Sequence, residues 1–230
     1  MFPTSHDITP GTLRACIQVL LNVLAPGNKV VIVTKPHFDC VKALCEVLLM
    51  FKNNFIFHFT IGSSDSNTLK YWEPGAPDFE ERLASLKYAH WKGYQTSVSP
   101  EPMLDGNIVD VVEQVLPYVT ETVWIGMPNQ LIGRLVMNGH RDQATINSTR
   151  RLMSSLSDQY IWDLYTRYKD NPKINMEGQY QEDRGNRYPL LLATVNLETL
   201  MVMAYNIKLK DTPFSATHTL SIPTTPEIPS

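Results

Sequence analysis

Short apolar runs alternate along the first 176 residues with longer segments in which apolar residues recur every three or four positions. The short, β-branched or aromatic runs predict strands at 29–34, 55–61 and 122–126. The repeat of the strand–helix unit predicts two further strands at 95–99 and 173–175. The longer segments predict helices at 9–24, 37–51, 78–92, 107–116 and 148–168. Strands that alternate with helices in this way require right-handed crossovers and a parallel sheet.

Polar and small residues gather directly after four of these strands, at 34–35, 62–65, 99–101 and 126–129. In a β/α barrel such loops share one rim, where binding sites are built. No glycine-rich nucleotide fingerprint follows any strand, which disfavours a dinucleotide-binding fold. We therefore expect an α/β chain that forms a parallel-sheet partial (β/α) barrel. The first ten residues read as the end of a strand and a loop, so we expect this barrel to be incomplete at its N-terminus.

The pattern divides the chain into two parts. Residues 1–176 are expected to form the partial barrel. Residues 177–230 are expected to be a C-terminal extension, with one helix or hairpin at 190–207 and a loose Thr- and Pro-rich end at 212–230. Within the first part, Asp78 and Glu81 have the spacing of a capping box at the start of a helix.

Composition narrows the function classes. The net charge of −3 gives no support to nucleic-acid binding, which needs clustered Lys and Arg. Three cysteines without framework spacing favour a reducing cytoplasm. We see neither a signal peptide nor an apolar run long enough for a membrane span. Cys40 and Cys45 are five apart in a predicted helix, so we interpret them as packing residues rather than metal ligands.

Several polar residues could have a catalytic or binding role, and each also has a purely structural interpretation. Adjacent side chains rarely converge, so Ser5-His6-Asp7 is a poor hydrolytic triad; His6 and Asp7 are ligand contacts, or Asp7 caps a loop beside a solvated His6. Glu73 and Glu101 could act as an acid/base pair on a glycoside, although Glu73 could equally pair with Arg82 or Lys70.

Hydroxyl groups follow two neighbouring strands. Ser63, Ser64 and Asp65, with Ser97 and Ser99, would suit a ribose and an amino-acid head group, or the first three could simply form a turn. Trp72 is a packing residue or a lid over an adenine. His58 alternates with three phenylalanines and so points to the opposite face of its strand, in a core or a barrel lumen.

Five segments occur in a characteristic order and spacing: TKP at 34–36, FTIGSSD at 59–65, WEPGAPDFEERL at 72–83, TSVSPEPMLD at 96–105 and VWIG at 123–126. Together they resemble the radical S-adenosylmethionine enzymes, in particular the branch similar to spore photoproduct lyase. FPTSHDITP at 2–10 looks like the loop after the second strand of that barrel. The resemblance covers about residues 2–176.

The resemblance implies residues that contact S-adenosylmethionine at the ends of the strands. These are Thr4, Ser5 and His6 near the methionyl group, Ser63, Ser64 and Asp65 near the ribose, Ser97, Ser99 and Glu101 near adenine or substrate, and the backbone of Ile125 and Gly126 beside adenine. Lys35 and Arg82 are candidates for the cofactor carboxylate or for pairing with Glu73. Asn129 is a further candidate for the rim.

The same family carries a C-x3-C-x2-C loop whose thiolates hold a [4Fe–4S] cluster, and this chain has no such triplet. The resemblance therefore implies the C-terminal portion of a radical S-adenosylmethionine enzyme, inactive alone and completed by a cluster-bearing N-terminal segment or partner chain. The alternatives are a non-catalytic binding or scaffold protein on a decayed barrel, and a carboxylate-dependent hydrolase. The substrate, small or macromolecular, stays open.

Overall fold

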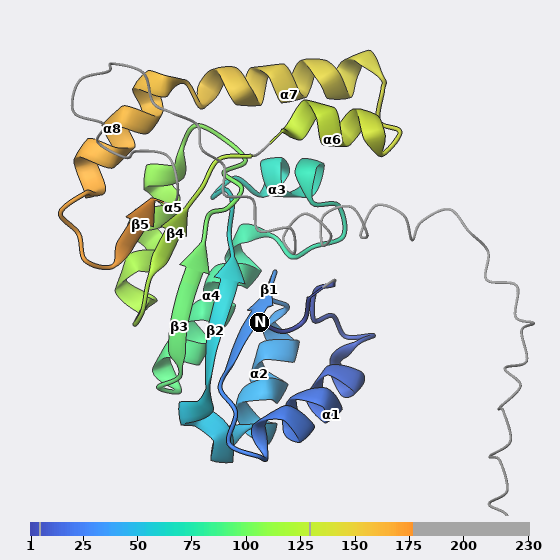
Figure 1. Cartoon of the computed structure of the whole chain (residues 1–230), viewed down its shortest axis with the longest axis vertical. Coiled ribbons are helices and arrows are strands. Elements are labelled where there is room, and N and C mark those ends of the chain that lie inside the picture. The colour runs from blue at the N-terminus through green and yellow to red at the C-terminus, as the bar shows by residue number, and fades with distance from the viewer. Residues whose placement is uncertain (5, 129, 177–230) are drawn as a thin grey trace, which may run out of the picture.

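The computed structural model describes residues 1–4, 6–128 and 130–176, which contain one all-parallel sheet of five strands in the order β1-β2-β3-β4-β5 (Figure 1). The α/β class is confirmed. The sheet is open, because β1 and β5 stand at opposite ends of this order and do not pair within the described residues. The strands are β1 (Val30–Thr34), β2 (Phe55–Thr60), β3 (Gln95–Ser99), β4 (Val123–Ile125) and β5 (Ile174–Met176).

Near its N-terminus the chain also pairs with the outer edge of β1 through backbone hydrogen bonds. Phe2 forms a parallel bridge with Ile32: its N–H donates to the Val31 carbonyl at 2.8 Å, and its carbonyl accepts from the Val33 N–H at 2.8 Å. The predicted end of a strand near the start of the chain is therefore present, and it extends the sheet at the β1 edge.

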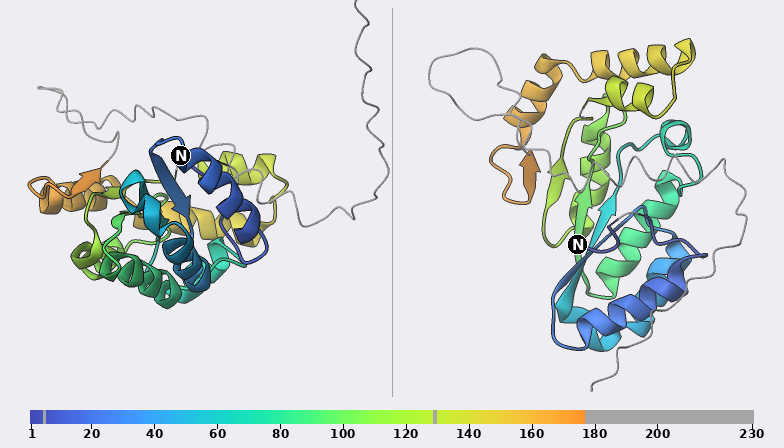
Figure 2. Two further views of the ribbon diagram at one scale, coloured as in Figure 1. Left: turned by 90° about the horizontal axis from the view of Figure 1, so that it is seen from below. Right: turned by 45° about the vertical axis from the view of Figure 1, so that its right-hand side comes forward.

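Helices α1 (Leu13–Leu24), α2 (Phe38–Val47), α4 (Phe79–Trp91) and α5 (Ile108–Val115) lie along one face of the sheet (Figure 2). Because side chains alternate across a strand, every second residue faces these helices. On β2 these are Phe55, Phe57 and Phe59, all at most 1% exposed, with successive ring centroids 5.2 and 5.3 Å apart. The aromatic row forms the middle of the core.

The residues in between point to the opposite face, which we call the open face. Val31 is exposed there, and Val33, His58, Thr60 and Trp124 are half-buried. The alternating burial of β1 and β2 shows that this face is less completely covered than the helical one.

The helical predictions need four corrections. The loop after β2 contains a short helix, α3 (Ser66–Trp72), which Asp65 caps, and α6 (Leu131–Met137) was not predicted. The single helix predicted at 148–168 is two helices, α7 (Gln143–Ser155) and α8 (Asp158–Tyr168). The break occurs because the Ser157 hydroxyl accepts from the Tyr160 N–H and starts a new helix. The helix predicted at 37–51 ends as α2 and continues as the 3-10 helix η1 (Leu49–Asn54).

The capping box at Asp78 is only half formed. Asp78 Oδ1 accepts from the Glu81 N–H at 2.9 Å, as predicted. The second hydrogen bond of a capping box, from the Asp78 N–H to the Glu81 carboxylate, does not form. The Glu81 carboxylate instead accepts from the Phe38 N–H at 3.0 Å and lies 3.6 Å from His37 Nδ1. Glu81 therefore joins the start of α2 to the start of α4.

The predictions for 177–230 lie outside the described residues. Within the described ones, no helix combines the length and the apolar character that a membrane span requires.

The aromatic row predicts a large, local effect on stability. Phe57→Ala should lower the free energy of unfolding by about 3–5 kcal/mol, because it leaves a cavity between β2 and the helices. Met50→Ala, at a side chain that is 82% exposed, should change it by less than about 0.5 kcal/mol. Urea denaturation measures both, and equal effects would show that the row is not the core.

Candidate functional site

The loops after β2, β3 and β4 are joined by backbone hydrogen bonds at the carboxyl edge of the sheet. Leu104 N–H donates to the Gly62 carbonyl at 2.9 Å, and Met103 N–H donates to the Gly126 carbonyl at 2.9 Å. Gly126 N–H in turn donates to the Pro100 carbonyl at 3.2 Å. The three loops thus form one connected edge, and the candidate residues at 62–65, 99–101 and 126 meet there.

Glu101 lies directly against Gly126. A Cβ placed on Gly126 would stand 2.6 Å from Glu101 Cγ and 2.8 Å from its Cδ, which is closer than non-bonded carbons tolerate. The missing side chain at Gly126 is what allows the Glu101 side chain to cross the end of β4. Ile125 beside it is buried in the core, and Asn129 lies outside the described residues.

The side chains of Ser63 and Asp65 form hydrogen bonds with nearby residues of the same loops. The buried Ser63 hydroxyl donates a short hydrogen bond to the Asp105 carboxylate and accepts from the Asp65 N–H at 2.9 Å. Asp65 accepts from the Thr68 hydroxyl at 2.7 Å and from the Thr68 N–H at 2.9 Å, and these bonds lower the pKa of Asp65. Both side chains therefore shape a turn and a helix cap. Ser64 between them is half-buried.

Ser97 and Ser99 sit on β3 and point to the open face. The Ser97 hydroxyl donates to the Thr122 carbonyl at 2.5 Å and lies 3.1 Å from His58 Nδ1. Burial lowers the pKa of His58 to about 4. Ser99 is one step nearer the carboxyl edge, paired in register with Thr60.

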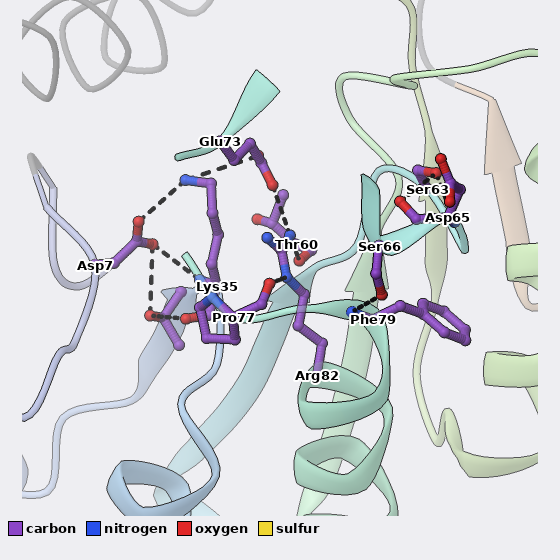
Figure 3. A network of polar contacts seen from close by, with 11 residues as sticks. Asp7, Lys35, Thr60, Ser63, Asp65, Ser66, Glu73, Pro77, Phe79 and Arg82 are labelled. Carbon is purple, nitrogen blue, oxygen red and sulfur yellow. Dashed lines mark hydrogen bonds and ion pairs between the residues drawn. The ribbon is translucent and has the colours of Figure 1, made fainter. Parts of the chain in front are cut away.

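A chain of four charges forms the other half of this edge (Figure 3). Lys35 Nζ lies 3.0 Å from Asp7 Oδ2 and 4.0 Å from Glu73 Oε1. Glu73 Oε2 lies 2.7 Å from Arg82 Nη1, as a charge contact rather than an aligned hydrogen bond. Of the partners considered for Glu73, Arg82 is confirmed.

Arg82 has no exposed surface and reaches up from α4 to the strand ends. Its Nε donates to the Pro77 carbonyl at 2.8 Å and its Nη1 to the Thr60 carbonyl at 3.2 Å. Nη2 has no hydrogen-bond partner among the described residues. The guanidinium therefore ties β2, the loop before α4 and Glu73 together.

The segment after the Phe2 bridge is anchored by Asp7. Its Oδ1 accepts from the Lys35 N–H at 2.9 Å, so the carboxylate joins this segment to the residue that follows β1. Thr4 and His6 are exposed, with His6 Nε2 3.8 Å from Cys16 Sγ, and Ser5 lies outside the described residues.

The three cysteines are free and buried in α1 and α2, as expected of packing residues. Burial raises the pKa of Cys40 to about 11 and that of Cys45 to about 12. Iron–sulfur clusters require thiolates. The described residues also contain no group of three His, Cys, Asp or Glu side chains that could hold a metal ion. The cysteines of this chain do not fit a [4Fe–4S] cluster.

Sequence reasoning missed one feature of the edge. An open hollow of about 530 Å³ lies between α3, the loop at 104–106 and α7, and its lining includes Trp72, Asp105 and Arg151. Asp105 ends the segment TSVSPEPMLD, but α7 is remote from it in the sequence, and no sequence pattern places α7 beside α3.

Comparisons of the chain with protein-family models, with curated proteins and with solved structures found no match.

The charge chain predicts a strong dependence on Arg82. Arg82→Met should destabilise the protein by about 3–5 kcal/mol, because it leaves the Glu73 carboxylate without its buried partner. The matched control is Arg167→Met, which breaks an ion pair to Glu113 whose side chains are 53% and 59% exposed. That change should cost less than about 1 kcal/mol. Similar losses in the two variants, measured by chemical denaturation, would contradict the assignment.

Proposed function

We propose that residues 1–176 are the S-adenosylmethionine-binding part of a radical S-adenosylmethionine enzyme, built as a partial (β/α) barrel. The sequential strand order with helices on one face supports the barrel reading, because a doubly wound sheet reverses its order at a switch point. The five motifs of the family fall on β1, β2, α3–α4, β3 and β4, and their polar residues lie at the same edge of the sheet.

The observation that carries the proposal is the position of Glu101 across Gly126. S-adenosylmethionine carries a sulfonium and an ammonium group, and a carboxylate held at the sheet edge complements positive charge. Gly126 is the cradle that makes this position accessible to the Glu101 side chain. Glu101 would orient the cofactor, and Ser99 at the end of β3 would add a hydroxyl group to the same edge.

Other family positions contribute less directly. Ser63 and Asp65 would act through the turn and the helix cap that they form, since their polar atoms are already engaged. Lys35 is tied to Asp7, and Arg82 to Glu73, so we assign these four residues to holding the edge in shape. Bound at this edge, S-adenosylmethionine would supply carbon-radical chemistry for hydrogen abstraction.

The iron–sulfur cluster does not belong to the described residues, since the three cysteines do not fit it. We propose that a cluster-bearing chain or segment supplies it and that this chain alone does not cleave the cofactor. A non-catalytic scaffold is the second candidate. It is favoured because the side chains of Ser63 and Asp65 already form hydrogen bonds with neighbouring residues of the chain. The fold does not select a substrate.

Calorimetry separates the two candidates. The purified chain should bind S-adenosylmethionine and, after anaerobic incubation with iron and sulfide, should contain no stoichiometric iron. Absence of cofactor binding would favour the scaffold. Stoichiometric iron with a visible absorbance band would contradict the statement that the chain lacks cluster ligands.

A glycine pair tests the role of Glu101. Gly126→Ala forces the Glu101 side chain away and should weaken S-adenosylmethionine binding at least about tenfold, or about 1.4 kcal/mol. Gly133→Ala on α6 is the control, because nothing lies within 4 Å of the added methyl group. It should leave the affinity unchanged within about twofold. Equal affinities in the two variants would remove Glu101 from the site.

A further inference from the structure

His58 and Ser97 form a polar pair on the open face, one step inside the sheet from the carboxyl edge. The register of β2 and β3 places them directly side by side, and His58 is also paired in register with Val33 of β1. In the next layer toward the edge, Thr60 and Ser99 are paired in the same way. The open face therefore carries one imidazole and three hydroxyl groups in two adjacent layers.

The hydrogen bonds of Ser97 fix the tautomer of His58. A carbonyl oxygen can only accept, so the single proton of the Ser97 hydroxyl lies on its bond to the Thr122 carbonyl. Ser97 Oγ is then an acceptor toward His58, and the imidazole must donate from Nδ1 across the 3.1 Å contact. A neutral imidazole protonated at Nδ1 has an unshared electron pair at Nε2.

The surroundings keep this imidazole uncharged. Burial is the cause that lowers the pKa of His58, and the residues paired with it on the neighbouring strands, Val33 and Ser97, carry no charge. Among the described residues the Nδ1 contact is the one hydrogen bond of the ring, which leaves Nε2 without a partner.

We propose that His58 Nε2 is a ligand-binding atom on the open face, which accepts a hydrogen bond from an uncharged N–H or O–H group. The hydroxyls of Thr60 and Ser99 extend the site toward the edge, and Val33 and Trp124 give it apolar flanks. The ligand class is a neutral, partly apolar molecule with an amide, alcohol or heterocyclic donor. As an assignment of the substrate site this rests on the proposed function, whereas the state of the imidazole does not.

The first test is the tautomer. Nitrogen-15 NMR of the labelled whole chain should show His58 protonated at Nδ1 at pH 7. Ser97→Ala removes the acceptor and should shift the population toward the Nε2–H form. An Nε2–H tautomer in the unaltered chain would overturn the proposal.

The second test uses diethyl pyrocarbonate, a small uncharged reagent that acylates an unprotonated imidazole nitrogen. Labelling of His58, followed by mass spectrometry, should fall by less than about twofold between pH 7 and pH 5. An imidazole of ordinary pKa would lose more than about tenfold over that range. The other five histidines of the chain are internal comparisons. Failure to label His58 in the folded chain, with labelling in urea, would show that Nε2 is closed to ligands.

Calorimetric measurement of S-adenosylmethionine binding to the unaltered chain and to His58→Gln distinguishes the proposed cofactor site from the proposed His58 site. If labelling succeeds while S-adenosylmethionine does not bind, the proposed function fails and the His58 site stands. If S-adenosylmethionine binds the unaltered chain and His58→Gln equally while His58 resists labelling, the cofactor site stands and the His58 site fails.

Discussion

The Arg82 guanidinium is the contact on which the N-terminal half of the edge depends. It is fully buried, yet it reaches the carbonyl at the end of β2, the carbonyl of Pro77 before α4 and the carboxylate of Glu73. Glu73 also pairs with Lys35, and Lys35 pairs with Asp7 in the segment that follows the Phe2 bridge. A buried charge is tolerated only when paired, so each member of this chain fixes the position of the next.

The other half of the edge is held in a different way. There the loops after β2, β3 and β4 are joined by backbone hydrogen bonds, and two glycines leave the space that these close approaches need. At Gly62 an added Cβ would stand 2.6 Å from the Pro102 carbonyl oxygen, and at Gly126 it would meet Glu101. Backbone hydrogen bonds hold these loops together, and the Glu101 side chain lies against Gly126 at the same edge.

The sequence predicts the parts of this structure that follow from local patterns. All five strands overlap the segments that the alternation of strands and helices predicts, and Asp78 caps α4. The prediction fails where a single side chain competes with the pattern: Ser157 breaks a helix, Asp65 starts one, and Glu81 leaves its capping box for the start of α2. These choices depend on which donor lies nearby in space, and spacing along the chain does not contain that information.

The same limit applies to the candidate site. Hydroxyl and carboxylate groups can be counted from the sequence, but whether they are available depends on the partners that folding gives them. Ser63 and Asp65 satisfy each other and their neighbours, so their presence at the edge is explained by the turn alone. Ser97 differs, because its hydroxyl donates to the Thr122 carbonyl and therefore accepts a hydrogen bond from His58 Nδ1. One structural hydroxyl therefore determines which nitrogen of the half-buried His58 imidazole carries the proton, although the hydroxyl itself is engaged within the sheet.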